Sequence, residues 1–193
     1  DYFHIDVMDG KFVENNTVEL MTEYSEYLNT ITNVPLDVHL MVEDVLPFIK
    51  SFMIFEPRNI TVHYEVAKNK EELLEWIEYI KKNNCKVGIS IKPDTKVEDI
   101  YEFLPFIHTV LIMTVEPGKG GQALIPETID KIRNLREYIE KENLEVDIEA
   151  DGGINADNIS TLADAGVDIA VVGTYLIGSA DYKETIKMLK VTI

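Results

Sequence analysis

Cysteine, basic residues and long apolar runs are all scarce in this chain of 193 residues, and each scarcity excludes a class of protein. The single cysteine, Cys85, cannot form an internal disulfide, so nothing requires an oxidising compartment. Only 18 Lys and Arg residues stand against 35 Asp and Glu, and the formal net charge of −17 would repel a nucleic-acid backbone. No apolar run approaches the roughly 20 residues that cross a bilayer, and no secretion signal is evident. The sequence therefore predicts a cytoplasmic protein with no nucleic-acid or membrane partner.

What the chain does contain is an alternation of short apolar runs with longer segments of helical spacing, as in residues 71–83 and 126–140. A hydrophobic content of 46% suffices for one core, so we expect a single domain over residues 1–193. The alternation predicts parallel strands joined by crossover helices, in an open doubly wound sheet or a closed barrel. Seven strands are expected, at residues 2–7, 36–41, 59–63, 86–91, 109–113, 145–150 and 169–172.

Polar side chains gather near the carboxyl ends of these expected strands. His4 and Asp6 are two residues apart and therefore share one face of a strand. His39 lies in the second strand, and Asp151 ends the sixth, just before two glycines. A lone buried histidine is more often a hydrogen-bonded core residue than a ligand. Two imidazoles and two carboxylates together, however, suit a divalent metal such as zinc, iron, manganese or cobalt.

Glycines form a second group, in three strand-to-helix loops late in the chain. Glycine lets backbone amides approach an anion closely, and Thr174 opens a short segment whose N-terminus can receive a phosphate. One such loop would be a weak signal, because tight turns also need glycine. Three in succession match the usual phosphate site of a parallel barrel. The loops contain Gly118-Lys119-Gly120-Gly121, Gly152-Gly153 and Gly173-Thr174.

Four runs resemble the ribulose-phosphate 3-epimerase family, in the right order over nearly the whole chain. They are His-Ile-Asp-Val-Met-Asp-Gly (4–10), Asp-Val-His-Leu-Met-Val (37–42), Met-Thr-Val-Glu-Pro-Gly-Lys-Gly-Gly-Gln (113–122) and Asp-Gly-Gly-Ile (151–154). The resemblance implies a (β/α)₈ TIM barrel of the ribulose-phosphate-binding type. It also implies metal-dependent epimerisation at carbon 3 of a ketose phosphate, interconverting D-ribulose 5-phosphate and D-xylulose 5-phosphate in the pentose phosphate pathway.

The same resemblance assigns roles to individual residues. Asp6 and Asp151 are the implied catalytic acid/base pair, and one divalent metal ion is implied. Its ligands would be His4, Asp6, His39 and Asp151. Substrate or phosphate contacts are implied for His39, Gly118, Lys119, Gly120, Gly121, Asp151, Gly152, Gly153, Gly173 and Thr174. Met8, Met41 and Met113 end strands and would line the pocket, although methionine is equally often core filler. Asp9, in an Asp-Gly turn, is expected to have no catalytic role.

The chain departs from the family pattern in three places. Lys119 stands where the family usually has Phe, and Thr174 stands where it usually has Ser; neither change removes a backbone amide. The chain also begins within a strand pattern, so we expect a domain that is N-terminally incomplete and lacks the barrel's first strand and helix. Family members commonly associate, and a homo-oligomer is expected.

Two other functions remain open. An allulose 6-phosphate 3-epimerase would use the same residues on a longer sugar, and comparing turnover on the two sugar phosphates discriminates them. A catalytically inactive metal- or phosphate-binding fragment would fold and bind metal without turnover. A decarboxylase of similar fold is disfavoured, because no lysine stands beside Asp6 or Asp151.

Overall fold

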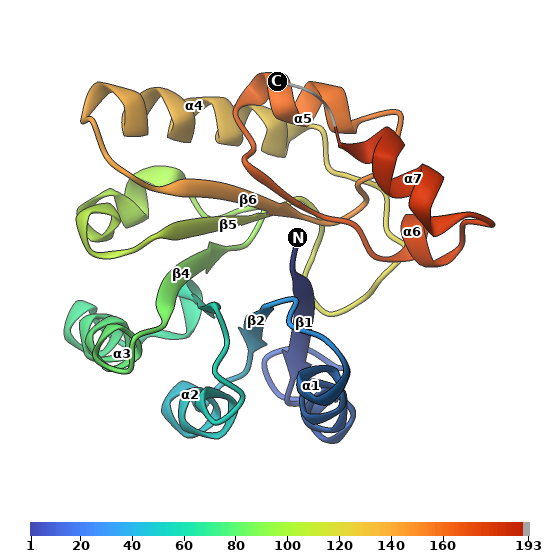
Figure 1. The fold of residues 1–193 in the computed structure, drawn as a ribbon. Coiled ribbons are helices and arrows are strands. Elements are labelled where there is room, and N and C mark those ends of the chain that lie inside the picture. Colours follow the sequence, from blue (N-terminus) through green and yellow to red (C-terminus); the bar gives the residue numbers. More distant parts are fainter. Residues whose placement is uncertain (191–193) are drawn as a thin grey trace. The chain divides into compact units, whose positions relative to one another are not determined.

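The computed structural model describes residues 1–190, which fall into two compact units. The first contains Asp1–Ser90 and Phe106–Thr109, and the second contains Ile91–Pro105 and the chain from Val110 onward. Each unit alternates strands with helices along the chain (Figure 1). No helix among the described residues is both long and apolar enough to span a membrane.

The first unit is a sheet of four parallel strands in chain order. Three helices connect and flank these strands, all on one face of the sheet (Figure 1). A short 3₁₀ turn, η1 (Tyr64–Val66), follows the third strand. The strands are β1 (Phe3–Met8), β2 (Leu36–Met41), β3 (Asn59–His63) and β4 (Lys86–Ile91), and the helices are α1 (Val18–Ile31), α2 (Val45–Met53) and α3 (Lys70–Lys82).

One face of this sheet is apolar and the other is polar. Alternate strand residues such as Ile5, Val38 and Ile60 are buried, and the helices supply apolar stripes at helical spacing. In α2 the buried stripe is Val45, Ile49 and Phe52. Burying each such side chain stabilises the fold by about 1.5–3 kcal/mol. The residues of opposite parity form the polar face; they are His4, Asp6, Asp37, His39, Asn59, Thr61, His63 and Ser90.

The second unit contains three strands, also in chain order, with helices between and after them. Its alternate residues Leu111, Met113 and Val115 form a buried cluster. Helix α5 ends at Gly166, whose φ of 107° is left-handed and whose carbonyl accepts hydrogen bonds from Arg136. The elements are η2 (Val97–Phe106), β5 (Thr109–Met113), α4 (Glu127–Lys141), β6 (Asp147–Asp151), α5 (Ile159–Ala165), β7 (Ile169–Val171), α6 (Thr174–Ile177) and α7 (Tyr182–Leu189).

The strands expected from the sequence are all present, and β2, β3, β4 and β5 have the expected bounds. The first strand was expected at residues 2–7 but runs from Phe3 to Met8, and the sixth was expected at 145–150 but runs from Asp147 to Asp151. The seventh ends one residue early, at Val171. Parallel pairing with the neighbouring strand sets these ends, and the local pattern does not contain that information. The single domain over the whole chain stays a prediction.

Cys85 provides a test of the packing between β3 and β4. Its thiol contacts the carbonyl oxygens of Pro57 and Lys86, at 3.3 and 3.2 Å. Burial, and to a lesser extent the Asp37 carboxylate, raises the pKa of Cys85 to about 12. Because the thiolate is the reactive form, we expect a disulfide reagent at pH 8 to label the folded chain about 10³-fold more slowly than the urea-unfolded chain.

The same shift sets a pH dependence. Above pH 9.0 the thiol ionises in the unfolded chain but stays protonated in the folded chain until about pH 12. The free energy of unfolding should therefore fall by about 1.4 kcal/mol per pH unit across this window. Urea unfolding of Cys85→Ala beside the unchanged protein isolates this part of the slope. Equal labelling rates in the folded and unfolded chains would contradict the burial of the thiol.

Candidate metal and acid/base site

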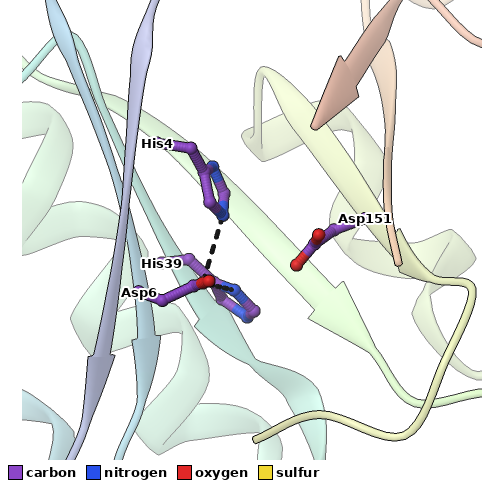
Figure 2. Close-up of side chains that lie close together, drawn as sticks. All are labelled: His4, Asp6, His39 and Asp151. Atoms are coloured by element: carbon purple, nitrogen blue, oxygen red, sulfur yellow. Dashed lines mark hydrogen bonds and ion pairs between the residues drawn. The ribbon is translucent and has the colours of Figure 1, made fainter. Parts of the chain in front are cut away.

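Three predicted site residues meet on the polar face of the first unit. His4 and Asp6 project from β1, and the parallel register pairs Asp6 with His39 of β2. The Asp6 Oδ1 atom lies 3.3 Å from His4 Nε2 and 3.0 Å from His39 Nδ1. Figure 2 shows the two imidazoles converging on this carboxylate. The structure thus brings together residues 33 positions apart in the chain.

The charges within this cluster are complementary. Burial alone would lower the pKa of His4, but the carboxylates of Asp6 and Asp37 hold it well above its ordinary value. Burial alone would raise the pKa of Asp6, but His4 and His39 hold it well below its usual range. Asp6 is therefore ionised at neutral pH, and its negative charge stabilises a positive charge on a neighbouring group.

The three side chains fit a divalent cation. Two imidazole nitrogens and a carboxylate oxygen are ligands that suit zinc, iron, manganese and cobalt. Ligand atoms about 2.1 Å from one ion, at angles between octahedral and tetrahedral, lie about 3.0–3.4 Å apart. The separations of 3.0 and 3.3 Å around Asp6 Oδ1 fall in that range. His4, Asp6 and His39 have the right donors at the right spacing.

A second layer of hydrogen bonds orients His4. The buried carboxylate of Asp37 accepts a bond from His4 Nδ1 at 2.6 Å, so that Nε2 is the nitrogen directed at Asp6. Asn59 Nδ2 in turn donates to Asp37 at 2.9 Å and to Thr61 at 3.0 Å. Alternation along β2 places Asp37 on the same face as His39. Its role is to hold His4, because a carboxylate behind an imidazole fixes the ring's orientation and tautomer.

Two further residues hold His39, on its other side. His39 Nε2 lies 2.9 Å from His63 Nε2, and His63 Nδ1 lies 3.0 Å from Glu65 Oε2. Neither residue is among the site residues predicted from the sequence. Parity could have found His63, which shares the inward face of β3 with Asn59 and Thr61. Glu65 lies beyond the strand, in η1, where parity gives no signal.

The loop after β1 supports Asp6 through its backbone, which sequence reasoning missed. The Thr17 hydroxyl donates to the Asp6 carbonyl at 2.6 Å and accepts from the Met8 amide at 3.0 Å. The Asp9 side chain accepts three backbone N–H groups, from Lys11, Phe12 and Glu43. Burial would raise the pKa of Asp9, but these donors hold it below its ordinary value. Asp9 is therefore a turn residue, as expected.

The predicted methionines occupy strand ends. Met8 and Met41 are cross-strand partners at the ends of β1 and β2, and both are buried. Met113 is the last residue of β5 in the second unit and belongs to its buried cluster. Their burial agrees with a role as core residues, and their place in a pocket stays a prediction.

In the second unit, Asp151 is the last residue of β6 and is held by Thr114. The Thr114 amide donates to the Asp151 carbonyl at 2.8 Å, and its hydroxyl donates to the Gly152 carbonyl at 2.6 Å. Gly152 and Gly153 have positive φ angles of 126° and 68°. A Cβ at Gly153 would lie 2.4 Å from the Leu124 backbone nitrogen, so only glycine fits.

The predicted glycine loops of the second unit also approach one another. A Cβ on Gly120 would lie 3.3 Å from the Thr174 hydroxyl, so residues 54 positions apart in the sequence are neighbours. The Gln122 side chain donates to the carbonyls of Glu116 and Lys119, at 2.7 and 2.8 Å, which fixes the loop's path. No described heavy atom beyond the chain neighbours lies within 4 Å of a Cβ built on Gly121 or Gly173. Open space thus adjoins two of the predicted phosphate-binding glycines.

Known proteins resemble this chain over almost its full length. The model of the ribulose-phosphate 3 epimerase family matches residues 1–177. A ribulose-phosphate 3-epimerase of Mycobacterium leprae is 38% identical over 98% of this chain and 83% of its own length. One from Escherichia coli K12 is 35% identical with the same coverage. Among solved structures, KGPDC from Streptococcus mutans matches with a TM-score of 0.69 at 12% identity, over 97% of this chain and 82% of that one. This last likeness shows the fold, which is that of TIM-barrel enzymes.

Proposed function

Because the chain belongs to the ribulose-phosphate 3-epimerase family and is an isomerase, we propose that it interconverts D-ribulose 5-phosphate and D-xylulose 5-phosphate in the pentose phosphate pathway. The observation that carries the proposal is the Asp6 carboxylate, held between two imidazoles on the polar face of β1. Nothing in a sheet's ordinary packing requires two imidazoles and a carboxylate on one face, and His39 among them is fully buried, which has a cost unless its nitrogens are used.

The chemistry needs two carboxylates. Carbon 3 of the ketose carries a proton made acidic by the neighbouring carbonyl, and epimerisation removes it from one face and returns a proton to the other. We assign the two faces to Asp6 and Asp151, each acting as base in one direction and as acid in the reverse. The depressed pKa of Asp6 keeps its carboxylate ionised at neutral pH. Asp151 enters this proposal through its motif and the family, with its backbone held by Thr114.

One divalent cation is part of the proposal, with His4, Asp6, His39 and Asp151 as its ligands. When bound, it would supply positive charge to stabilise the negative charge that develops on the substrate's oxygens. The chain's own part is to orient the donors: Asp37 turns His4 Nε2 toward Asp6, and the register of β1 against β2 places His39 beside it.

The phosphate is assigned to the glycine loops of the second unit. Open space lies where a Cβ would stand on Gly121 and Gly173, and Thr174 adds a hydroxyl beside Gly120. Gly152 and Gly153 are assigned as further backbone contacts. Gly118, Lys119 and His39 complete the proposed substrate contacts. Anchoring the phosphate fixes the distant carbon 3, which converts binding energy into orientation.

The test is turnover of D-ribulose 5-phosphate by the purified chain, before and after removal of metal with a chelator and after return of zinc, iron, manganese or cobalt. We expect chelation to lower kcat by at least about 100-fold and metal to restore it. D-Allulose 6-phosphate, run in parallel, distinguishes the hexose phosphate epimerase by the larger kcat/KM. A folded, metal-loaded chain that turns over neither sugar would contradict the proposal and favour the binding-only alternative.

A further inference from the structure

A line of close contacts between polar side-chain atoms leads from the proposed cation site through the interior of the first unit. It runs from Asp6 through His39 and His63 to Glu65, with separations of 3.0, 2.9 and 3.0 Å. The side chains of both histidines are fully buried, whereas the side chain of Glu65 is 20% exposed. Neither His63 nor Glu65 belongs to the proposed set of ligands.

The chemistry of this line restricts where its protons lie. The Glu65 carboxylate can only accept, so His63 Nδ1 must carry a proton that it donates to Glu65 Oε2. A neutral His63 then has a bare Nε2, which is an acceptor. The 2.9 Å contact between the two Nε2 atoms therefore requires that His39 donates its Nε2–H. In that tautomer His39 Nδ1 has no proton, and its lone pair points toward the proposed cation position beside Asp6 Oδ1.

The opposite tautomer of His39 conflicts with its neighbours. If Nδ1 carried the proton and bonded to Asp6, Nε2 would need a donor from His63. His63 would then keep protons on both nitrogens and be a buried cation, or turn a bare Nδ1 toward the Glu65 carboxylate. The first arrangement puts a charge on a fully buried side chain, balanced by Glu65, and the second sets two acceptors against each other. The surroundings hold His63 in place, because the Phe12 ring packs against its imidazole at a centroid distance of 4.7 Å.

We propose that Glu65 and His63 are positioning residues that set the tautomer of His39 and present its Nδ1 lone pair to the cation. The inference rests on the cation site of the proposed function, and it makes His39 the counterpart of His4, whose other nitrogen is held by Asp37. The partner of His4 is the Asp37 carboxylate itself. The partner of His39 is the imidazole of His63, which in turn contacts the Glu65 carboxylate. Partners of this kind orient metal-binding imidazoles and make them more basic.

The first test is the affinity of the purified chain for Co²⁺ and Zn²⁺, measured by competition with a chromophoric chelator. We expect Glu65→Gln to weaken binding by about ten- to hundredfold, with Glu65→Ala at the larger end because the Glu65 acceptor for His63 Nδ1 is lost. Glu65 is partly exposed on the short turn η1, so neither change removes core packing. The matched control is Glu78→Gln, an exposed glutamate on α3 that should leave affinity within about twofold.

A second readout detects the tautomer itself. Long-range ¹H–¹⁵N spectra of the zinc-loaded chain should show His63 protonated at Nδ1 and His39 protonated at Nε2, with the pattern disturbed in Glu65→Ala. A proton on His39 Nδ1 in the zinc-loaded chain, or unchanged affinity in both Glu65 variants, would overturn the inference. A chain that binds no zinc would remove the cation site and the inference together.

These outcomes separate the two proposals. Zinc binding that weakens in the Glu65 variants, without turnover in any form, supports the positioning role and contradicts the proposed function. Full turnover with unchanged metal affinity in Glu65→Gln and Glu65→Ala supports the proposed function and contradicts the positioning role. If His39 orientation alone is affected, turnover of Glu65→Gln should return toward normal at saturating metal, which a general loss of folding would not allow.

Discussion

Asp6→Asn should lower kcat for D-ribulose 5-phosphate by about 10²- to 10⁴-fold, because the amide can neither accept nor return the carbon 3 proton. The change keeps the shape of the side chain, and Asn can still pair with His39 and His4, so the fold should survive. Steady-state kinetics measures kcat, and the circular dichroism of each variant reports whether the fold survives. Asp99→Asn, at an exposed position on η2, is the control for an aspartate without a role.

Deuterium exchange sharpens this prediction by separating the two carboxylates. In Asp151→Asn, Asp6 can still remove the proton from one epimer and return solvent deuterium to the same face. We therefore expect exchange at carbon 3 of one epimer to continue in deuterated water while epimerisation stops. Asp6→Asn should stop exchange from that epimer. Near-normal epimerisation in either variant would remove the two-aspartate assignment.

Gly153→Ala should lower the free energy of unfolding by about 2–4 kcal/mol. About 1 kcal/mol comes from placing a Cβ at a φ of 68°, and the rest from overlap with the segment alongside. The added carbon would lie 2.4 Å from the Leu124 nitrogen and 2.8 Å from the Gln122 carbonyl oxygen, both of which are backbone atoms. A flexible side chain could move aside, but backbone atoms can shift only together with the loop.

Gly121→Ala is the matched control for this effect. Gly121 has a similar φ of 75°, and a Cβ there meets no atom within 4 Å. Gly121→Ala should therefore lower the free energy of unfolding, measured with urea, only by the conformational cost of about 1 kcal/mol. Equal losses in the two variants would show that the 122–124 segment relaxes freely, contrary to the close packing described.

Much of the site could be read from local pattern. Because side chains alternate along a strand, His4 and Asp6 had to share a face, and the position of His39 in an apolar run placed it on the next strand. The Asp-Gly turn at Asp9 and the glycine loops were likewise predictable, since each depends on the conformational preferences of neighbouring residues. The resemblance to a family then assigned roles that parity alone left open.

The supporting partners could not be read in the same way. Glu65 is an acidic residue like many others in this chain, and nothing local separates it from the solvated glutamates of α3. Parity puts Asp37 on the same face of β2 as His39, but it does not identify the partner of Asp37. Their roles follow from which strand residues are cross-strand neighbours: Asp37 is paired with His4 in the register of β1 and β2, and η1 returns Glu65 to His63. A slip of one residue in that register would move every polar side chain to the other face.

The sequence by itself determined the strand and helix periods, the acidic surface and the identity of the donor side chains, because these depend on composition and on spacing along one segment. Only the tertiary structure decided the strand ends, the meeting of Asp6 with His39, the contacts of His63 with His39 and Glu65, and the approach of Gly120 to Thr174. The physical reason is that hydrogen-bond register and side-chain contact join residues that are distant in the chain. Their free energies depend on distances that no single segment contains.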